Sequence, residues 1–175
     1  MKRKTKRYVQ IYTGDGKGKT TAALGLSIRA AGHGMKTYIG QFMKGQGYGE
    51  RTALRDHPCI TLKQFGDVKC IRREEVTQKH IEQANKGLTM AYNAMISGEY
   101  DVVILDEVNV AIWFGLLSVQ QVLDFLNQRP ENVEVILTGR RAPKELIEYA
   151  DLVSEIKEVK HYYHQGVLAR KGIEQ

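Results

Sequence analysis

Short apolar runs alternate along the chain with longer segments whose apolar residues recur every three or four positions. The short runs predict strands over residues 7–12, 36–42, 60–65, 102–105, 133–137 and 152–156. The longer segments predict helices over residues 20–31, 73–96, 119–126 and 143–149. Strands that alternate with helices in this way indicate an α/β domain with a mainly parallel sheet and helices on both faces.

The run Val102-Val103-Ile104-Leu105 is apolar on both faces of the expected strand, which is typical of a central strand in a parallel sheet. The glycine-rich segment 43–50 reads as a loop. No internal repeat and no linker divides the chain. We therefore expect one domain over residues 8–175, preceded by a basic tail over residues 1–7.

The formal net charge is +6, and most of it lies in Lys2, Arg3, Lys4, Lys6 and Arg7. Such a tail can contact an anionic surface, but a solvated tail is the commoner case, and no basic stripe interleaved with aromatics predicts nucleic-acid binding. Cys59 and Cys70 are too few for a disulfide framework. No apolar run reaches the ~20 residues of a membrane span. A cytoplasmic protein without a membrane or nucleic-acid partner is expected.

A glycine-rich, lysine-containing segment follows the first predicted strand and opens the first predicted helix. It consists of Gly14, Asp15, Gly16, Lys17, Gly18, Lys19, Thr20 and Thr21. The glycines allow a tight turn whose N–H groups point inward, and the helix N-terminus adds positive potential, so the segment is expected to bind a nucleotide triphosphate. Lys19 is placed to reach phosphate oxygens, and Thr20 can offer its hydroxyl to Mg²⁺. Thr13 stands where the strict phosphate-loop pattern begins with glycine.

Asp106 and Glu107 close the central strand, where phosphate-loop domains place the acid that holds Mg²⁺. Together with Thr20 they are the predicted metal ligands, for Mg²⁺ or Mn²⁺, and ATP is the predicted nucleotide. Arg140 follows another strand and can meet an anion at the carboxyl edge of the sheet, or be an ordinary solvated loop residue.

Phosphate loops serve kinases, hydrolases and transferases, so these motifs leave the reaction open. A kinase or NTPase acting on the γ-phosphate would use Asp106 and Glu107 equally well. A non-catalytic, nucleotide-gated module that binds another partner is a further alternative.

From Tyr8 to Glu174 the chain resembles the corrinoid adenosyltransferases of the phosphate-loop type. The resemblance is carried by residues 14–23 (GDGKGKTTAA), 41–45 (QFMKG), 49–51 (GER), 105–107 (LDE), 137–140 (LTGR), 150–155 (ADLVSE), 159–161 (VKH) and 171–174 (KGIE). This ordered series is far more specific than a phosphate loop alone.

The resemblance implies that the Co(I) of a reduced corrinoid, cob(I)alamin or a precursor, attacks C5′ of ATP and expels tripolyphosphate. It implies Lys19 and Glu107 as catalytic residues and adds Arg51 and Arg140 to the ATP-binding set. A homodimer is also implied, and a flavoprotein is a candidate for the partner that reduces the corrinoid.

The chain departs from the family pattern after the third strand. Relatives from enteric bacteria carry an aromatic Gly-Phe-Thr-Trp stretch there, associated with displacing the lower cobalt ligand, and this chain reads Gly66-Asp67-Val68-Lys69. Either Phe65, Tyr48 or Trp113 replaces those aromatics, or a different corrinoid is preferred.

Overall fold

The computed structural model of the protein describes residues 6–69 and 71–174. Within these residues six strands form one sheet in the order β3-β2-β4-β5-β1-β6, and every neighbouring pair is parallel. The strands are β1 (Val9–Thr13), β2 (Thr37–Phe42), β3 (Ile60–Phe65), β4 (Val102–Asp106), β5 (Glu134–Thr138) and β6 (Leu152–Glu155). The predicted α/β class and parallel sheet are confirmed.

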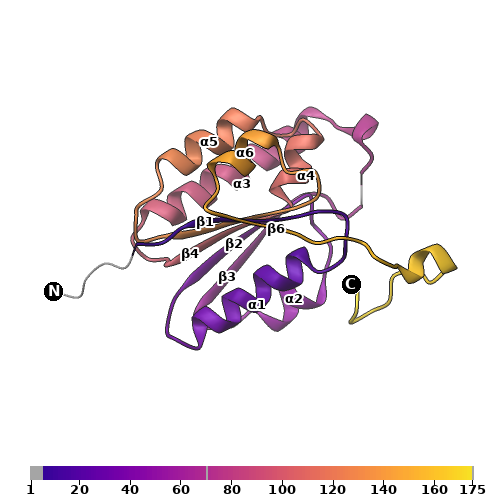
Figure 1. Cartoon of the computed structure of the whole chain (residues 1–175), viewed down its shortest axis with the longest axis horizontal. Helices are drawn as coiled ribbons and strands as arrows, with labels where there is room; N and C mark the ends of the chain where they lie inside the picture. The colour runs from indigo at the N-terminus through magenta and orange to yellow at the C-terminus, as the bar shows by residue number, and fades with distance from the viewer. Residues whose placement is uncertain (1–5, 70, 175) are drawn as a thin grey trace.

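Helices cover both faces of the sheet (Figure 1). One face carries α1 (Lys19–Ala31) and α2 (Gly49–Ala53), and the other carries α3 (Gln78–Ile96), α4 (Val108–Trp113), α5 (Val119–Asn127) and α6 (Lys144–Tyr149). The central strand β4 contributes side chains to the cores on both faces of the sheet. Ile104 packs in the same cluster as Ala23 of α1, whereas Val103 and Leu105 pack into the larger cluster on the α3 side. Alternation along one buried strand thus builds two hydrophobic cores.

The predicted strands agree with the observed ones to within two residues, and 60–65 is matched at both ends. The helix predicted over 73–96 is wrong at its start. Residues Arg73–Glu75 form a short 3-10 turn, and α3 begins only after Thr77, whose extended backbone and capping box with His80 separate the two.

Two short helices were not predicted. The segment 43–50 is a loop only to Tyr48, because α2 begins at Gly49. Helix α4 follows β4 directly, since Glu107 adopts a left-handed conformation (φ 63°) that turns the chain at once from strand into helix. The apolar run of α4 carries no periodicity by which it could be distinguished from the end of the strand.

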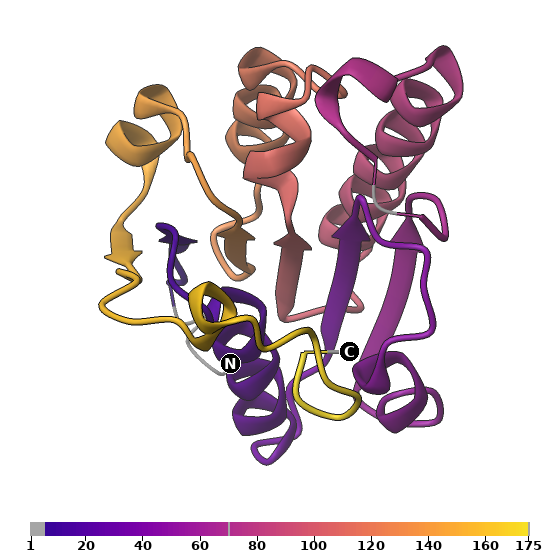
Figure 2. The ribbon, with the colours of Figure 1, turned by 90° about the vertical axis from the view of Figure 1, so that its right-hand side faces the viewer.

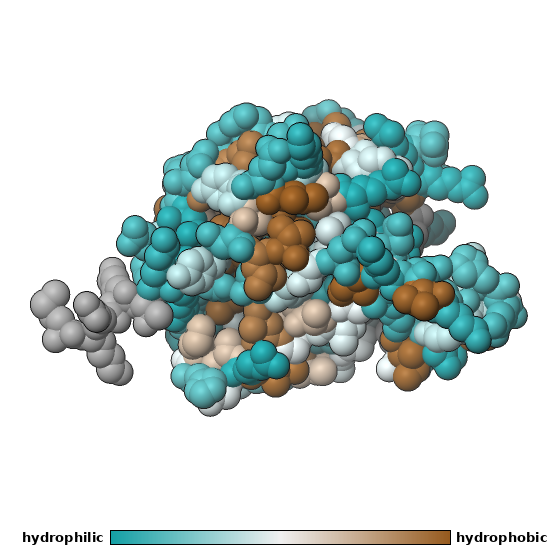
Figure 3. All heavy atoms as spheres, in the orientation of Figure 1, coloured by the Kyte–Doolittle hydropathy of each residue, from teal (hydrophilic) through white to brown (hydrophobic). Residues whose placement is uncertain are grey.

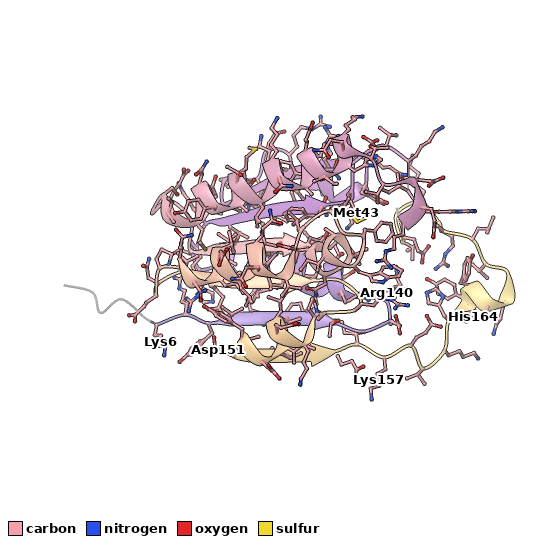
Figure 4. The ribbon with its side chains drawn as sticks, turned by 90° about the horizontal axis from the view of Figure 1, so that it is seen from above. Lys6, Met43, Arg140, Asp151, Lys157 and His164 are labelled. Carbon is pink, nitrogen blue, oxygen red and sulfur yellow. The ribbon has the colours of Figure 1, made fainter. Side chains whose placement is uncertain are left out.

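Parallel strands place their carboxyl ends at one edge of the sheet, and the chain after β6 crosses in front of that edge (Figure 2). Within this segment Tyr162–Gln165 form a 3-10 turn. Lys6 and Asp151 lie at the opposite end from Met43 and Arg140 (Figure 4).

The structure describes only part of the predicted basic tail and one of the two cysteines. Arg7, the last residue of the predicted tail, pairs with Asp101 at 3.0 Å, whereas Met1–Thr5 lie outside the described residues. Cys59 is a free thiol and Cys70 lies outside the described residues.

Candidate active site

The loop between β1 and α1 has the backbone of a phosphate-binding loop. Gly14 and Gly18 have φ values of +94° and +123°, which disfavour side chains. A Cβ atom on Gly14 would lie 2.5 Å from the carbonyl oxygen of Ile156, and the N–H of Gly16 donates to that same oxygen at 2.7 Å. The chain leaving β6 therefore fixes the shape of the loop, and this close approach explains the glycines at 14 and 16.

Lys19 and Thr20 open α1 beneath this loop. The Lys19 ammonium donates to the carbonyl oxygen of Gly16 at 2.6 Å and is buried. Burial lowers the pKa of Lys19, and nearby Arg140 lowers it further. Thr20 Oγ1 donates to Asp106 Oδ1 at 2.8 Å, so the two sequence motifs meet in the structure.

Asp106 is the centre of a buried polar cluster. Only 1% of it is exposed, and it accepts hydrogen bonds from four side chains. Besides Thr20, these are Thr138 Oγ1 at 2.7 Å, Gln41 Nε2 at 3.1 Å and Lys44 Nζ at 2.8 Å. A carboxylate that is removed from water needs such donors, so β2, β4 and β5 are bound together at the edge where the loop lies.

Glu107, the next residue, faces a cavity instead of the cluster. Burial raises the pKa of Glu107, and the neighbouring carboxylate of Asp106 raises it further, while Lys44, Lys19 and Arg140 oppose the rise. Burial makes the ionised form of Glu107 less favourable, and a nearby cation would stabilise that form. Glu107 is therefore suited to a position beside a metal ion that accompanies a bound polyphosphate.

The cavity, of about 490 Å³, lies at the carboxyl edge of the sheet. The phosphate loop and the start of α1 line one side of the cavity. The segment after β2 contributes Lys44, Tyr48 and Glu50, and the C-terminal segment closes the far side with His161 and residues 172–174. Figure 4 shows Met43 and Arg140 at this end of the sheet, facing the segment that carries His164.

Lys17 joins the C-terminal segment to the loop. Its ammonium donates to the carbonyl oxygen of Ile173 at 3.0 Å and lies 3.6 Å from a carboxylate oxygen of Glu174. Glu174 is also held by Tyr162 and by Arg170, and these hydrogen bonds lower its pKa to about 2. The end of the described chain is thus tied to the rim of the cavity.

The structure brings together most of the predicted site residues. Residues 16–21, Glu107 and Arg140 line the cavity, and Asp106 lies directly behind Thr20. Gly14 is not among the residues that line the cavity, but it contacts the chain that leaves β6 and so helps to set the shape of the loop. Asp15 is exposed and 4.0 Å from Arg140, and Arg51 is exposed on α2, outside the residues that line the cavity.

Sequence reasoning missed Gln41, Lys44 and Thr138 as members of this site. Each lies at or just after the carboxyl end of a strand adjacent to β4. Strand order was the missing information, because only the pairing of β2 and β5 with β4 brings these three side chains to Asp106.

The three aromatic candidates have different surroundings. Tyr48 lines the cavity, whereas Phe65 is buried against Phe42. Trp113 is 38% exposed and packs under the guanidinium of Arg141, 4.3 Å from the ring centroid. Of the three, Tyr48 is the one placed to contact a ligand in the cavity.

The donor set beside the loop suits a hard divalent cation. A hydroxyl and carboxylate oxygens, from Thr20, Asp106 and Glu107, are ligands that Mg²⁺ and Mn²⁺ prefer. Across residues 6–69 and 71–174 there is no cluster of three or more His, Cys, Asp or Glu side chains able to hold a metal by themselves. Phosphate oxygens and water would therefore have to complete the coordination.

Comparison with known proteins identifies close relatives. Residues 5–175 match the model of the family described as ATP:corrinoid adenosyltransferase BtuR/CobO/CobP. A corrinoid adenosyltransferase of Escherichia coli K12 is 35% identical over 169 residues, covering 94% of this chain and 83% of the relative. One from Salmonella typhimurium is 36% identical over 167 residues with the same coverage, and one from Pseudomonas aeruginosa is 35% identical over 166 residues, covering 94% of this chain and 81% of the relative. Among the described residues no helix is long and apolar enough to span a membrane.

Proposed function

The chain belongs to the ATP:corrinoid adenosyltransferase family, a family of transferases, and from this premise we propose that it transfers the 5′-deoxyadenosyl group of ATP to the Co(I) of a reduced corrinoid. The substrate would be cob(I)alamin or a cobalamin precursor, and the products are an adenosylated corrinoid and tripolyphosphate. The observation that carries the proposal is that the phosphate loop and Glu107 line one cavity at the edge of the sheet, with Asp106 hydrogen-bonded to Thr20 beside it.

In this reaction the two electrons of the new cobalt–carbon bond come from Co(I), and the bond between C5′ and its oxygen breaks. No protein nucleophile is needed. What the protein must supply is stabilisation of the negative charge on the departing tripolyphosphate. The backbone of residues 16–20, the Lys19 ammonium and Arg140 line the cavity and are positioned to do this.

We propose that Thr20, Asp106 and Glu107 are the residues that would hold Mg²⁺ or Mn²⁺. When bound, the ion neutralises charge on the triphosphate and polarises its oxygens. The raised pKa of Glu107 supports this assignment, because a nearby divalent cation would relieve the cost of ionising that buried carboxyl.

The test is a product analysis. Incubation of the protein with ATP, Mg²⁺ and chemically reduced cobalamin should release tripolyphosphate and produce the visible spectrum of an alkylated cobalamin. Release of ADP and phosphate would favour the kinase or NTPase alternative. Nucleotide-dependent corrinoid binding without product would favour the non-catalytic module.

Three further expectations belong to the proposal. A homodimer is supported by the edge strand β6, where Leu152 and Val153 are exposed, and by Ile147, which is exposed on α6. Figure 3 shows apolar side chains on the face of the molecule where α6 and β6 lie. A flavoprotein reductant and a cytoplasmic location remain predictions. Analytical ultracentrifugation tests the homodimer directly.

A further inference from the structure

Lys44 lies where a metal ion would be expected in this site. Its ammonium is 2.8 Å from Asp106 Oδ2, 3.3 Å from Thr20 Oγ1 and 3.9 Å from Glu50 Oε1. A hydroxyl from the phosphate loop and a carboxylate from the central strand are the pair that positions Mg²⁺ in phosphate-loop proteins. The protein therefore already places a positive charge between these two groups.

The ammonium and a divalent cation cannot share this position. Mg²⁺ binds oxygen at about 2.0–2.1 Å, so an ion at Asp106 and Thr20 would take the space that the Lys44 head group fills, and the two charges would repel each other. The side chain of Lys44 is 15% exposed, so water does little to screen that repulsion.

The main chain beside Lys44 is held by a hydrogen bond, whereas the ammonium of Lys44 can reach a second position in the cavity. Met43 has a left-handed backbone (φ 58°), and its N–H donates to the carbonyl oxygen of Phe65 at 3.0 Å. Lys44 also lines the cavity, and its ammonium lies 5.5 Å from the centroid of the Tyr48 ring. A four-carbon side chain on this anchored residue can turn from the carboxylate cluster towards the cavity without moving the backbone.

We propose that Lys44 is a tethered cation that pairs with Asp106, beside Glu50, before substrate binds, and that its ammonium moves to the triphosphate when a divalent metal arrives with ATP. The inference deepens the proposed function and rests on it for the identity of the nucleotide. It assigns to Lys44 two consequences: free divalent metal is kept out of the site, and metal binding is coupled to nucleotide binding.

The experiment measures Mn²⁺ binding to the protein without nucleotide, by loss of the free-ion electron paramagnetic resonance signal. In Lys44→Gln, an amide can still donate to Asp106, but the competing positive charge is gone. Removal of one charge at hydrogen-bond distance from a buried carboxylate is expected to tighten Mn²⁺ binding by about tenfold or more. Lys44→Arg keeps the charge and should bind Mn²⁺ as the wild type does.

Lys63→Met is the matched control, because Lys63 is exposed on the neighbouring strand β3 and its loss changes the net charge by the same amount. Thermal unfolding of each variant verifies that it is folded. If Lys44→Gln binds Mn²⁺ no more tightly than wild type and Lys63→Met, the inference is overturned, and the same holds if Lys44→Arg gains as much as Lys44→Gln.

Failure of this inference is distinguishable from failure of the proposed function. A wild-type protein that adenosylates cobalamin while Lys44→Gln shows no gain in Mn²⁺ affinity refutes the role of Lys44 alone. A wild-type protein without adenosyl transfer refutes the proposed activity, and the nucleotide-free Mn²⁺ titration still reports on Lys44.

Discussion

The substitution Asp106→Asn tests whether the buried cluster is held together by the charge of Asp106. The amide has nearly the same shape, and its oxygen can still accept from Lys44 and Gln41. Its NH2 group then faces the hydroxyls of Thr20 and Thr138, which must accept instead of donate, so the change removes the negative charge and reverses two hydrogen bonds. Breaking a buried ion pair by removing one partner costs about 3–5 kcal/mol. Glu50, 3.9 Å from the Lys44 ammonium, offers partial compensation, and so we expect the lower end, about 3 kcal/mol.

The assay is urea unfolding at neutral pH, followed by circular dichroism, with Asp101→Asn as the matched control. Asp101 pairs with Arg7 at 3.0 Å, but its side chain is 37% exposed, so that substitution should cost about 1 kcal/mol or less. The double variant Asp106→Asn with Lys44→Gln should cost clearly less than the sum of the single variants, because the second change removes the unpaired ammonium. Equal losses for Asp106→Asn and Asp101→Asn, or strict additivity, would refute the reasoning.

Three more predictions concern the phosphate loop and Glu107. Lys19→Met should lower adenosyl transfer about 10²–10³-fold while the protein remains folded, since one stabilising contact to a departing anion is lost; unchanged steady-state turnover would contradict this role. Gly16→Ala places a Cβ atom 2.7 Å from the backbone oxygen of Lys157 and should weaken ATP binding in calorimetry, whereas Gly47→Ala, with open space around it, should not. Glu107→Gln should abolish most turnover yet raise the melting temperature at about pH 7. The pKa of Glu107 is raised in the folded state, so its contribution favours folding at low pH and is lost as the pH rises through that pKa; the gain should therefore vanish near pH 4, and an equal gain at both pH values would argue against it.

Local sequence was sufficient for the six strands, for the longer helices apart from the start of α3, and for the phosphate loop, but not for the short helices α2 and α4. The apolar runs predict the strands because burial on both faces of a parallel sheet requires them, and the glycines at 14, 16 and 18 predict the phosphate loop because its turns exclude side chains. The helix over 73–96 was wrong at its start because the capping of α3 by Thr77 through His80 depends on side-chain geometry that periodicity does not report.

The order of the strands was decided by tertiary structure alone. Gln41, Lys44 and Thr138 are up to about a hundred residues apart in the chain, and they meet only because β2 and β5 flank β4. The same is true of the C-terminal segment, whose contact with Lys17 no local pattern predicts.

The sequence by itself thus determined that the chain carries a triphosphate-binding loop and a carboxylate pair, because each is encoded by consecutive residues. Only the folded chain decided that Lys44 pairs with Asp106, at the position where we propose that a metal ion binds. Electrostatic neutralisation of a buried charge is a contact between distant segments, and its strength depends on distances of a few ångströms that only packing sets.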